Sequence, residues 1–167
     1  MVDKPPSLED IVIDLVERVS RLEERKAGSR GDTFWMLDVL RGRDQDASGH
    51  VVFAGVVHTP TGRQFEWQEE RTVVELVDDE WAKAAASLAA LGHPVRLALL
   101  RALYEGVHTV RELGSLPDVG TTGQIYHHMR DLQAAGWVRQ ERRNSYTIPP
   151  DRIVPLLAIL SAATSSP

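Results

Sequence analysis

The sequence contains no cysteine among its 167 residues. Disulfide bonds, thiolate metal ligands and cysteine redox switches are therefore excluded, and we expect a cytoplasmic protein. The sequence also lacks an apolar run approaching the roughly 20 residues that cross a bilayer, so we expect no membrane segment. Its first residues, Met1-Val2-Asp3-Lys4-Pro5-Pro6, show no basic region followed by an apolar stretch, and we expect no secretion signal.

The features that catalysis or metal binding requires are scarce as well. There is no glycine-rich phosphate loop, no cysteine nucleophile and no pair of carboxylates set in an apolar stretch. His50 and His58 end the same expected strand, about 26 Å apart when extended. His127 and His128 are adjacent on an expected helix and diverge. We therefore expect no enzyme activity, no metal site and no cofactor.

Positive charge is in deficit overall, with a formal net charge of −5. Its distribution is uneven: residues 92–148 hold 7 Lys/Arg and 5 Asp/Glu, whereas residues 1–91 hold 11 and 18. Basic side chains that gather in one part of an acidic chain are typical of a local nucleic-acid contact. The excess is thin, so the pattern predicts weak non-specific DNA binding that depends strongly on salt.

The segment 121–132 has the pattern of a recognition helix. Thr121 is a suitable N-cap, and Ile125, Met129 and Leu132 fall on one apolar stripe. Short or planar hydrogen-bonding side chains and one cation occupy the other side: Thr122, Gln124, Tyr126, His127 and Arg130. With Thr121 at the helix start, such side chains suit contact with DNA, in which they read base edges while holding phosphate. Gln124 is the first candidate for a base contact, because a carboxamide can pair bidentately with adenine.

The flanking segments support a winged helix-turn-helix. Residues 109–114 predict a short preceding helix, and Pro117-Asp118-Val119-Gly120 supplies a turn. Residues 137–148 predict a β-hairpin with a basic tip, where Arg142 and Arg143 would contact phosphate or the minor groove. The alternative is a plain helical bundle with an unrelated hairpin.

Two segments resemble the arsenic-repressor-like (ArsR) winged-helix regulators. Leu88-Ala89-Ala90-Leu91-Gly92-His93-Pro94-Val95-Arg96-Leu97-Ala98-Leu99-Leu100 is similar to the family's opening, in which an apolar helix leads through a small and a polar residue to Pro, Arg and Leu. Ile125-Tyr126-His127-His128-Met129, followed by Leu132 and Ala135-Gly136-Trp137-Val138, is similar to its second signature. The resemblance covers roughly residues 79–163, about half of the chain.

The resemblance implies a homodimeric, DNA-binding transcription regulator that dimerises through its first and last helices. Metal-sensing members bind through cysteines before the recognition helix or through acidic and histidine pairs on the last helix. This chain has no cysteine, and its last helix offers Asp151 alone, so those metal sites are not carried over.

The last expected helix, residues 149–163, is apolar around most of its surface. Leaving several Leu or Ile side chains in water costs about 1.5–3 kcal/mol each, so a second copy should cover them. The expected dimer interface comprises Ile153, Leu156, Leu157 and Leu160, with Trp81 and Leu88 from the helix near residues 79–91.

The N-terminal part departs from the family pattern. Residues 8–28 predict an amphipathic helix that packs on its own domain or forms a second dimer contact; both remain open. Residues 34–40 predict a short helix, 50–58 and 63–68 predict strands, and 71–77 fit helix or strand. The aromatic residues of this part would enclose an apolar small-molecule effector or simply hold the hairpin on the domain: Trp35, Phe53, Phe65 and Trp67.

The sequence thus predicts an α+β fold, mainly α, with an N-terminal extension over residues 1–77 and a winged helix-turn-helix over residues 78–167. The predicted function is a homodimeric transcription regulator that binds double-stranded DNA at an inverted repeat. Two alternatives stay open: a small-molecule-responsive regulator that uses the hairpin aromatics, and a protein-interaction module that uses the winged fold without DNA.

Overall fold

The computed structural model describes residues 8–28, 35–44, 47–79 and 81–164. They form an α+β fold that is mainly helical, and the chain divides into two compact units, Met1–Ser48 and Gly49–Pro167. The sequence predicted a boundary between residues 77 and 78. The division falls earlier because the hairpin of residues 50–72 packs against the C-terminal helix and so belongs to the second unit. Within the described ranges, no helix is long and apolar enough to cross a membrane.

The first unit contains α1 (Leu8–Gly28) and α2 (Trp35–Arg43). The apolar repeat of α1 predicted a helix here, and the structure confirms it. The short helix predicted at 34–40 begins at Trp35 and continues to Arg43. Within it, Arg41 Nη1 lies 2.9 Å from Asp38 Oδ1, one turn earlier. The caps expected at Ser7, Asp32 and Thr33 lie outside the described residues.

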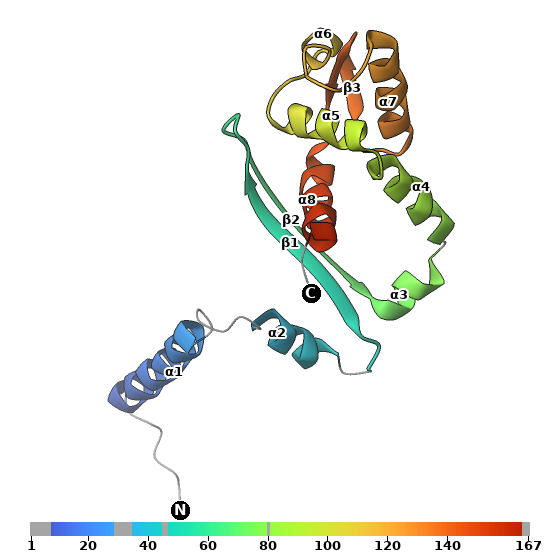
Figure 1. Ribbon diagram of the computed structural model, residues 1–167. Helices are drawn as coiled ribbons and strands as arrows, with labels where there is room; N and C mark the ends of the chain where they lie inside the picture. Colours follow the sequence, from blue (N-terminus) through green and yellow to red (C-terminus); the bar gives the residue numbers. More distant parts are fainter. Residues whose placement is uncertain (1–7, 29–34, 45–46, 80, 165–167) are drawn as a thin grey trace, which may run out of the picture. The chain divides into compact units, whose positions relative to one another are not determined.

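An antiparallel hairpin begins the second unit (Figure 1). Strand β1 (His50–His58) pairs with β2 (Gln64–Thr72) in an unbroken register. Thr59 closes the turn between them, because its N–H donates to the Arg63 carbonyl at 2.9 Å. The prediction for β1 is confirmed residue for residue, whereas β2 runs four residues beyond the predicted end at 68.

A short helix, α3 (Val73–Asp78), follows directly. The sequence had left residues 71–77 as helix or strand; the first two belong to β2 and the rest to α3. Thr72 Oγ1 accepts from the Glu75 N–H at 3.2 Å, and Glu75 Oε2 accepts from the Thr72 N–H at 2.9 Å. This reciprocal capping box satisfies two backbone donors that the new helix would otherwise leave free. The strand therefore ends at Thr72 and a helix begins at the next residue.

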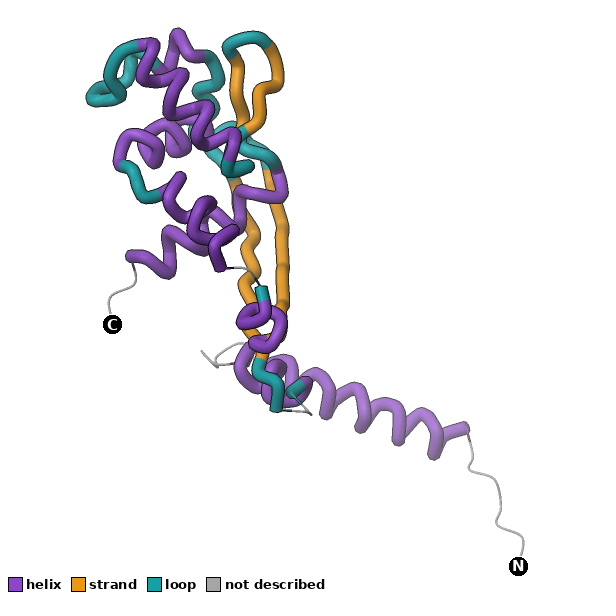
Figure 2. Tube along the Cα trace, turned by 90° about the vertical axis from the view of Figure 1, so that its right-hand side faces the viewer, coloured by secondary structure: helices purple, strands orange, loops and turns teal. Residues whose placement is uncertain are grey.

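The hairpin lies along the last helix, α8 (Pro150–Thr164), as Figure 1 and Figure 2 both show. Gly55 permits the close approach: a Cβ there would sit 2.8 Å from Val154 Cγ1. Val154 is consequently only 2% exposed, and Ile153 and Leu156, which join the hydrophobic core, are 6% and 4% exposed within a single chain.

This burial corrects part of the predicted dimer interface. Ile153 and Leu156 were assigned to it on the expectation that one subunit could not cover the last helix. The β-hairpin covers one side of that helix, so these two side chains belong to the core of their own chain. The other four residues of the predicted interface remain partly accessible in a single chain: Leu157 and Leu160 are half-buried, and Trp81 and Leu88 are exposed.

The remaining elements enclose the hydrophobic core (Figure 1). In chain order they are α4 (Trp81–Leu91), α5 (Pro94–Tyr104), α6 (Val110–Leu113), α7 (Thr122–Ala134), β3 (Arg139–Arg142) and β4 (Ser145–Thr147). Leu99, Leu113 and Trp137 are among its most deeply buried side chains. Trp137 also spans two elements, since its Nε1 donates to the Ser87 carbonyl of α4 at 3.0 Å. The core therefore fixes α7 and the β3–β4 hairpin against α4 and α5.

Candidate nucleic-acid interface

Helix α7 has a fixed start and a fixed rotation about its axis. Thr121 is its N-cap, as predicted, and Gly136 follows its end with φ of +75°, a conformation that glycine adopts without strain. Ile125, Met129 and Leu132 are each 0% exposed. Because that stripe is fully buried, the opposite side of the helix must point to solvent.

All eight residues predicted to contact DNA are exposed: Thr121, Thr122, Gln124, Tyr126, His127, Arg130, Arg142 and Arg143. The first six come from α7 and its N-cap, and the last two lie at the β3–β4 turn. The structure thus brings the predicted helix residues into one exposed side and adds the two hairpin arginines beside α6 and α7.

Gln124 has a structural task that the sequence interpretation did not assign to it. Its Oε1 accepts from the Thr121 N–H at 2.7 Å, while Thr121 Oγ1 accepts from the Gln124 N–H at 3.4 Å. Gly120, with φ of +84°, leaves room for this, because a Cβ there would overlap the carboxamide oxygen. The oxygen of Gln124 therefore faces the helix start, and bidentate pairing with adenine would need a different rotamer.

Asn144 connects three elements of this surface. Its side-chain Oδ1 accepts from the Tyr126 hydroxyl of α7 at 2.9 Å, and its backbone carbonyl accepts from the Val110 N–H that begins α6 at 3.0 Å. Asn144 also forms the β3–β4 turn with φ of +61°, a left-handed conformation that asparagine tolerates better than most residues. One residue therefore positions the hairpin tip against both helices.

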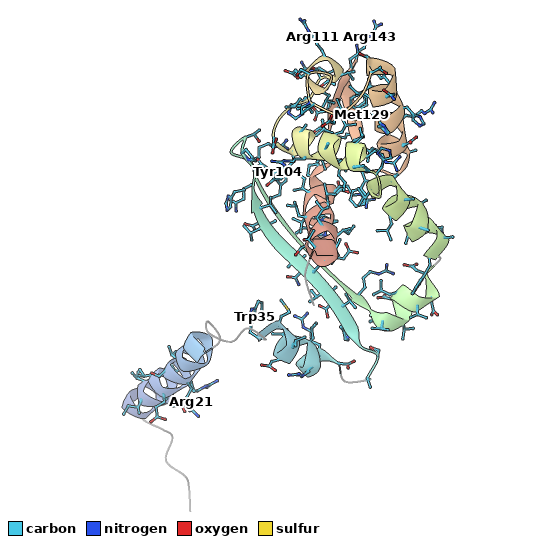
Figure 3. The ribbon with its side chains drawn as sticks, viewed as in Figure 1. Arg21, Trp35, Tyr104, Arg111, Met129 and Arg143 are labelled. Atoms are coloured by element: carbon cyan, nitrogen blue, oxygen red, sulfur yellow. The ribbon has the colours of Figure 1, made fainter. Side chains whose placement is uncertain are left out.

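Three cationic side chains border the same surface from α6 and the hairpin. Arg142 and Arg143 are exposed at the hairpin tip, and Arg111 is exposed on α6. Figure 3 shows Arg111 and Arg143 projecting at the same end of the second unit. Sequence reasoning missed Arg111, although an arginine inside a short helix before a recognition helix could have pointed to it.

The carboxylate next to Arg111 is engaged by hydrogen bonds at the start of α6. Glu112 Oε2 accepts from the Thr109 hydroxyl at 2.6 Å and from the Thr109 N–H at 3.0 Å. Those hydrogen bonds to Thr109 lower the pKa of Glu112 below its usual value. The acid is held against the start of α6, where a negative charge is favourable.

Two histidines on α7 have different surroundings. His127 is on the exposed side, where its Nδ1 accepts from Arg130 Nη2 at 3.2 Å. His128 lies against His93, with ring centroids 4.7 Å apart. Burial, followed by the charges of His93 and Arg96, lowers the pKa of His128. His128 therefore packs beside His93, the N-cap of α5.

The four aromatic residues proposed as a ligand pocket are not gathered in one unit. Trp35 belongs to the first unit. The strand register puts Phe53, Phe65 and Trp67 on the same side of the hairpin as Gly55, toward α8. Phe65 lines a cavity of about 50 Å³ and Trp67 lines a separate, open hollow of about 450 Å³, so neither space is enclosed by both aromatic residues. This placement favours the alternative in which the aromatics hold the hairpin on the domain.

No protein-family model matches the chain, and neither a curated protein nor a solved structure matches it. Within the described part of the chain, no group of three or more His, Asp or Glu side chains is arranged to hold a metal ion. What the chain does must therefore be inferred from its own residues.

Proposed function

We propose that this chain is a sequence-specific, DNA-binding transcription regulator that acts as a homodimer, with a winged helix-turn-helix in its second unit. One observation carries the proposal: α6, α7 and the β3–β4 turn meet at Asn144, and their outer side is polar and bears arginines. A helix that turns a polar side outward beside a basic hairpin suits insertion into the major groove with flanking phosphate contacts.

The side chains divide into two roles by their chemistry. Thr122, Tyr126 and His127 are uncharged or weakly basic hydrogen-bonding groups along α7, suited to base edges. Gln124 joins them chiefly through its NH₂ donors, because its oxygen is engaged in the cap. Cations supply the sequence-independent contacts to phosphate: Arg111, Arg130, Arg142 and Arg143.

Dimerisation follows from the apolar residues that one chain leaves uncovered. Trp81 is 70% exposed and Leu88 is 52% exposed. With Leu76, Ala84 and Ala85 they line an apolar groove of about 810 Å³ between α3 and α4. A twofold partner that contacts this groove and the half-buried Leu157 and Leu160 would remove these side chains from water. Two copies of α7 would then read half-sites about 34 Å apart.

Selection of bound fragments from genomic DNA tests the proposal. We expect enrichment of one imperfect inverted repeat and binding that weakens steeply with salt. The double variant Arg142→Ala/Arg143→Ala should bind all sequences more weakly, and its salt slope should be shallower by about 1 for each phosphate that is no longer neutralised. Arg101→Ala is the control, because it removes an exposed arginine of α5 that pairs with Glu105 at the end of that helix.

Failure to enrich any sequence, together with no salt-dependent binding by the unaltered protein, would rule out the DNA-binding proposal. The protein-interaction alternative would then be the better one. A fall in the logarithm of affinity half as large for the single Arg101 control as for the double variant would show that net charge alone drives association, and it would remove the hairpin from the proposed contact.

A further inference from the structure

Helix α1 carries an apolar stripe that the other described residues of the first unit do not cover. Ile11, Val12, Leu15, Val16 and Val19 are between 43% and 58% exposed. In proteins most of the stability of a helix comes from packing its apolar face against another element, and α1 presents such a face over much of its 21 residues. The stripe therefore needs an occupant, and its pattern indicates which one.

The stripe follows a heptad repeat. With Val12 at position a, Leu15 is at d and Val19 at the next a. The sequence continues the d positions at both ends with Leu8 and Leu22. Valine at a combined with leucine at d favours parallel, two-stranded coiled coils over larger assemblies. Ile13, at b, is also exposed and lies outside this seam.

The flanking positions favour the same orientation. In a parallel pair, each g residue meets the e residue five positions later on the partner. Here Ile11 at g precedes Val16 at e, and Arg18 at g precedes Glu23 at e in the sequence. One combination is apolar and the other joins opposite charges. An antiparallel pair would instead bring e against e, which sets Glu9 and Glu23 of the two copies against each other.

We propose that α1 pairs with α1 of a second copy of this chain in a parallel, in-register, two-stranded coiled coil. Apart from Ile13, the outer positions from Asp14 to Arg21 are polar, as such a coil requires: Asp14 forms an ion pair with Arg18 at 3.7 Å, and Glu17 is exposed. The helix spans about 31 Å, three heptads, which is short for a coiled coil alone. A second contact between the same two chains would raise the effective concentration of the helices. The pairing itself requires only a second copy and no DNA.

Single-cysteine variants of the full chain test this arrangement, since the sequence has no cysteine of its own. Val12→Cys and Val19→Cys place a thiol at the two a positions, and Glu17→Cys places one at the outward f position as the control. In a parallel pair, identical a positions face each other. Under mild oxidation, both a-position variants should form disulfide-linked dimers at least about tenfold faster than the control.

Each outcome supports or overturns the proposal. In an antiparallel pair a residue faces its own copy only at the midpoint, so Val12→Cys and Val19→Cys could not both cross-link. Cross-linking of one a position alone would therefore overturn the parallel orientation. Cross-linking of neither would overturn the parallel pair, and equal cross-linking of all three would show random collision. None of these results depends on DNA binding, so they leave the proposed function untouched.

Discussion

The hydroxyl of Tyr126 on α7 donates to Oδ1 of Asn144 at the β3–β4 turn, with 2.9 Å between the oxygens. The two residues are 18 positions apart and both lie on the exposed side of the second unit. The bond crosses from the helix proposed to read bases to the hairpin proposed to touch phosphate. Its main effect should be on the relative position of the two elements, because an exposed hydrogen bond adds little to overall stability.

Tyr126→Phe tests whether the Tyr126–Asn144 hydrogen bond holds the β3–β4 hairpin in position against α7. Loss of the hydroxyl should lower the free energy of unfolding by less than about 1 kcal/mol, since water can replace an exposed partner. Amide hydrogen exchange in residues 139–147 should nevertheless become faster, and DNA affinity should fall. Tyr104→Phe is the matched control, because its hydroxyl donates at a long 3.4 Å to the His58 carbonyl. Unchanged exchange in the Tyr126 variant would show that the hairpin is held without this bond.

Gln124→Glu separates the two roles of Gln124. A carboxylate keeps the acceptor for the Thr121 N–H and adds a negative charge at the helix N-terminus, so the melting temperature should stay equal or rise. The NH₂ donors are removed, and specific DNA binding should weaken by about 1–3 kcal/mol, measured as the affinity ratio of cognate to scrambled duplex. Gln124→Ala should lower both stability and specificity. A Glu variant that kept full specificity would leave Gln124 as a cap only.

The contrast between Gln124 and Ile153 shows how far the sequence could lead. Caps, the buried stripe of α7 and strand β1 depend on residues close together in the chain, so local patterns predicted them. The cap of Gln124 was also readable, because Thr121 and Gln124 have the spacing of a capping box, the same as Thr72 with Glu75.

The burial of Ile153 could not be predicted from local sequence patterns. It depends on a hairpin nearly 100 residues earlier in the chain that packs on α8, and on Gly55 lying opposite Val154. An apolar helix indicates that cover is needed but does not say whether its own chain or a partner supplies it. The Tyr126–Asn144 bond was hidden for the same reason, since no pattern in either segment refers to the other.

His128 should make the stability of the second unit depend on pH. Its pKa in the folded chain lies below the ordinary 6.5, because of burial and then the charges of His93 and Arg96, with Asp131 acting in the opposite direction. Below pH 6.5 the unfolded chain therefore takes up a proton that the folded chain does not. Stability should fall as pH drops from 6.5 toward the lowered pKa and then level off for this group.

Urea unfolding across this pH range measures the effect, and His128→Gln should flatten the decline. His127→Gln removes the neighbouring exposed ring, and this variant should show the same decline in stability with falling pH as the unaltered protein. A decline of the same size in the His128 variant and the unaltered protein would assign the pH dependence to other groups.

Gly55→Ala should destabilise the second unit by about 1–3 kcal/mol, the usual cost of adding a methyl group to a packed contact. The added Cβ would lie 2.8 Å from Val154 Cγ1, and Val154 is only 2% exposed, so neither side can yield without moving β1 off α8. Gly92→Ala is the control, because its nearest atoms would be 3.7 Å away. Chemical denaturation compares the two, and adding Val154→Ala to the Gly55 variant should recover part of the stability, since the clash disappears. A Gly55 variant as stable as the Gly92 control would mean that the hairpin does not rest on α8, and Ile153 and Leu156 would then return to the surface offered to a partner.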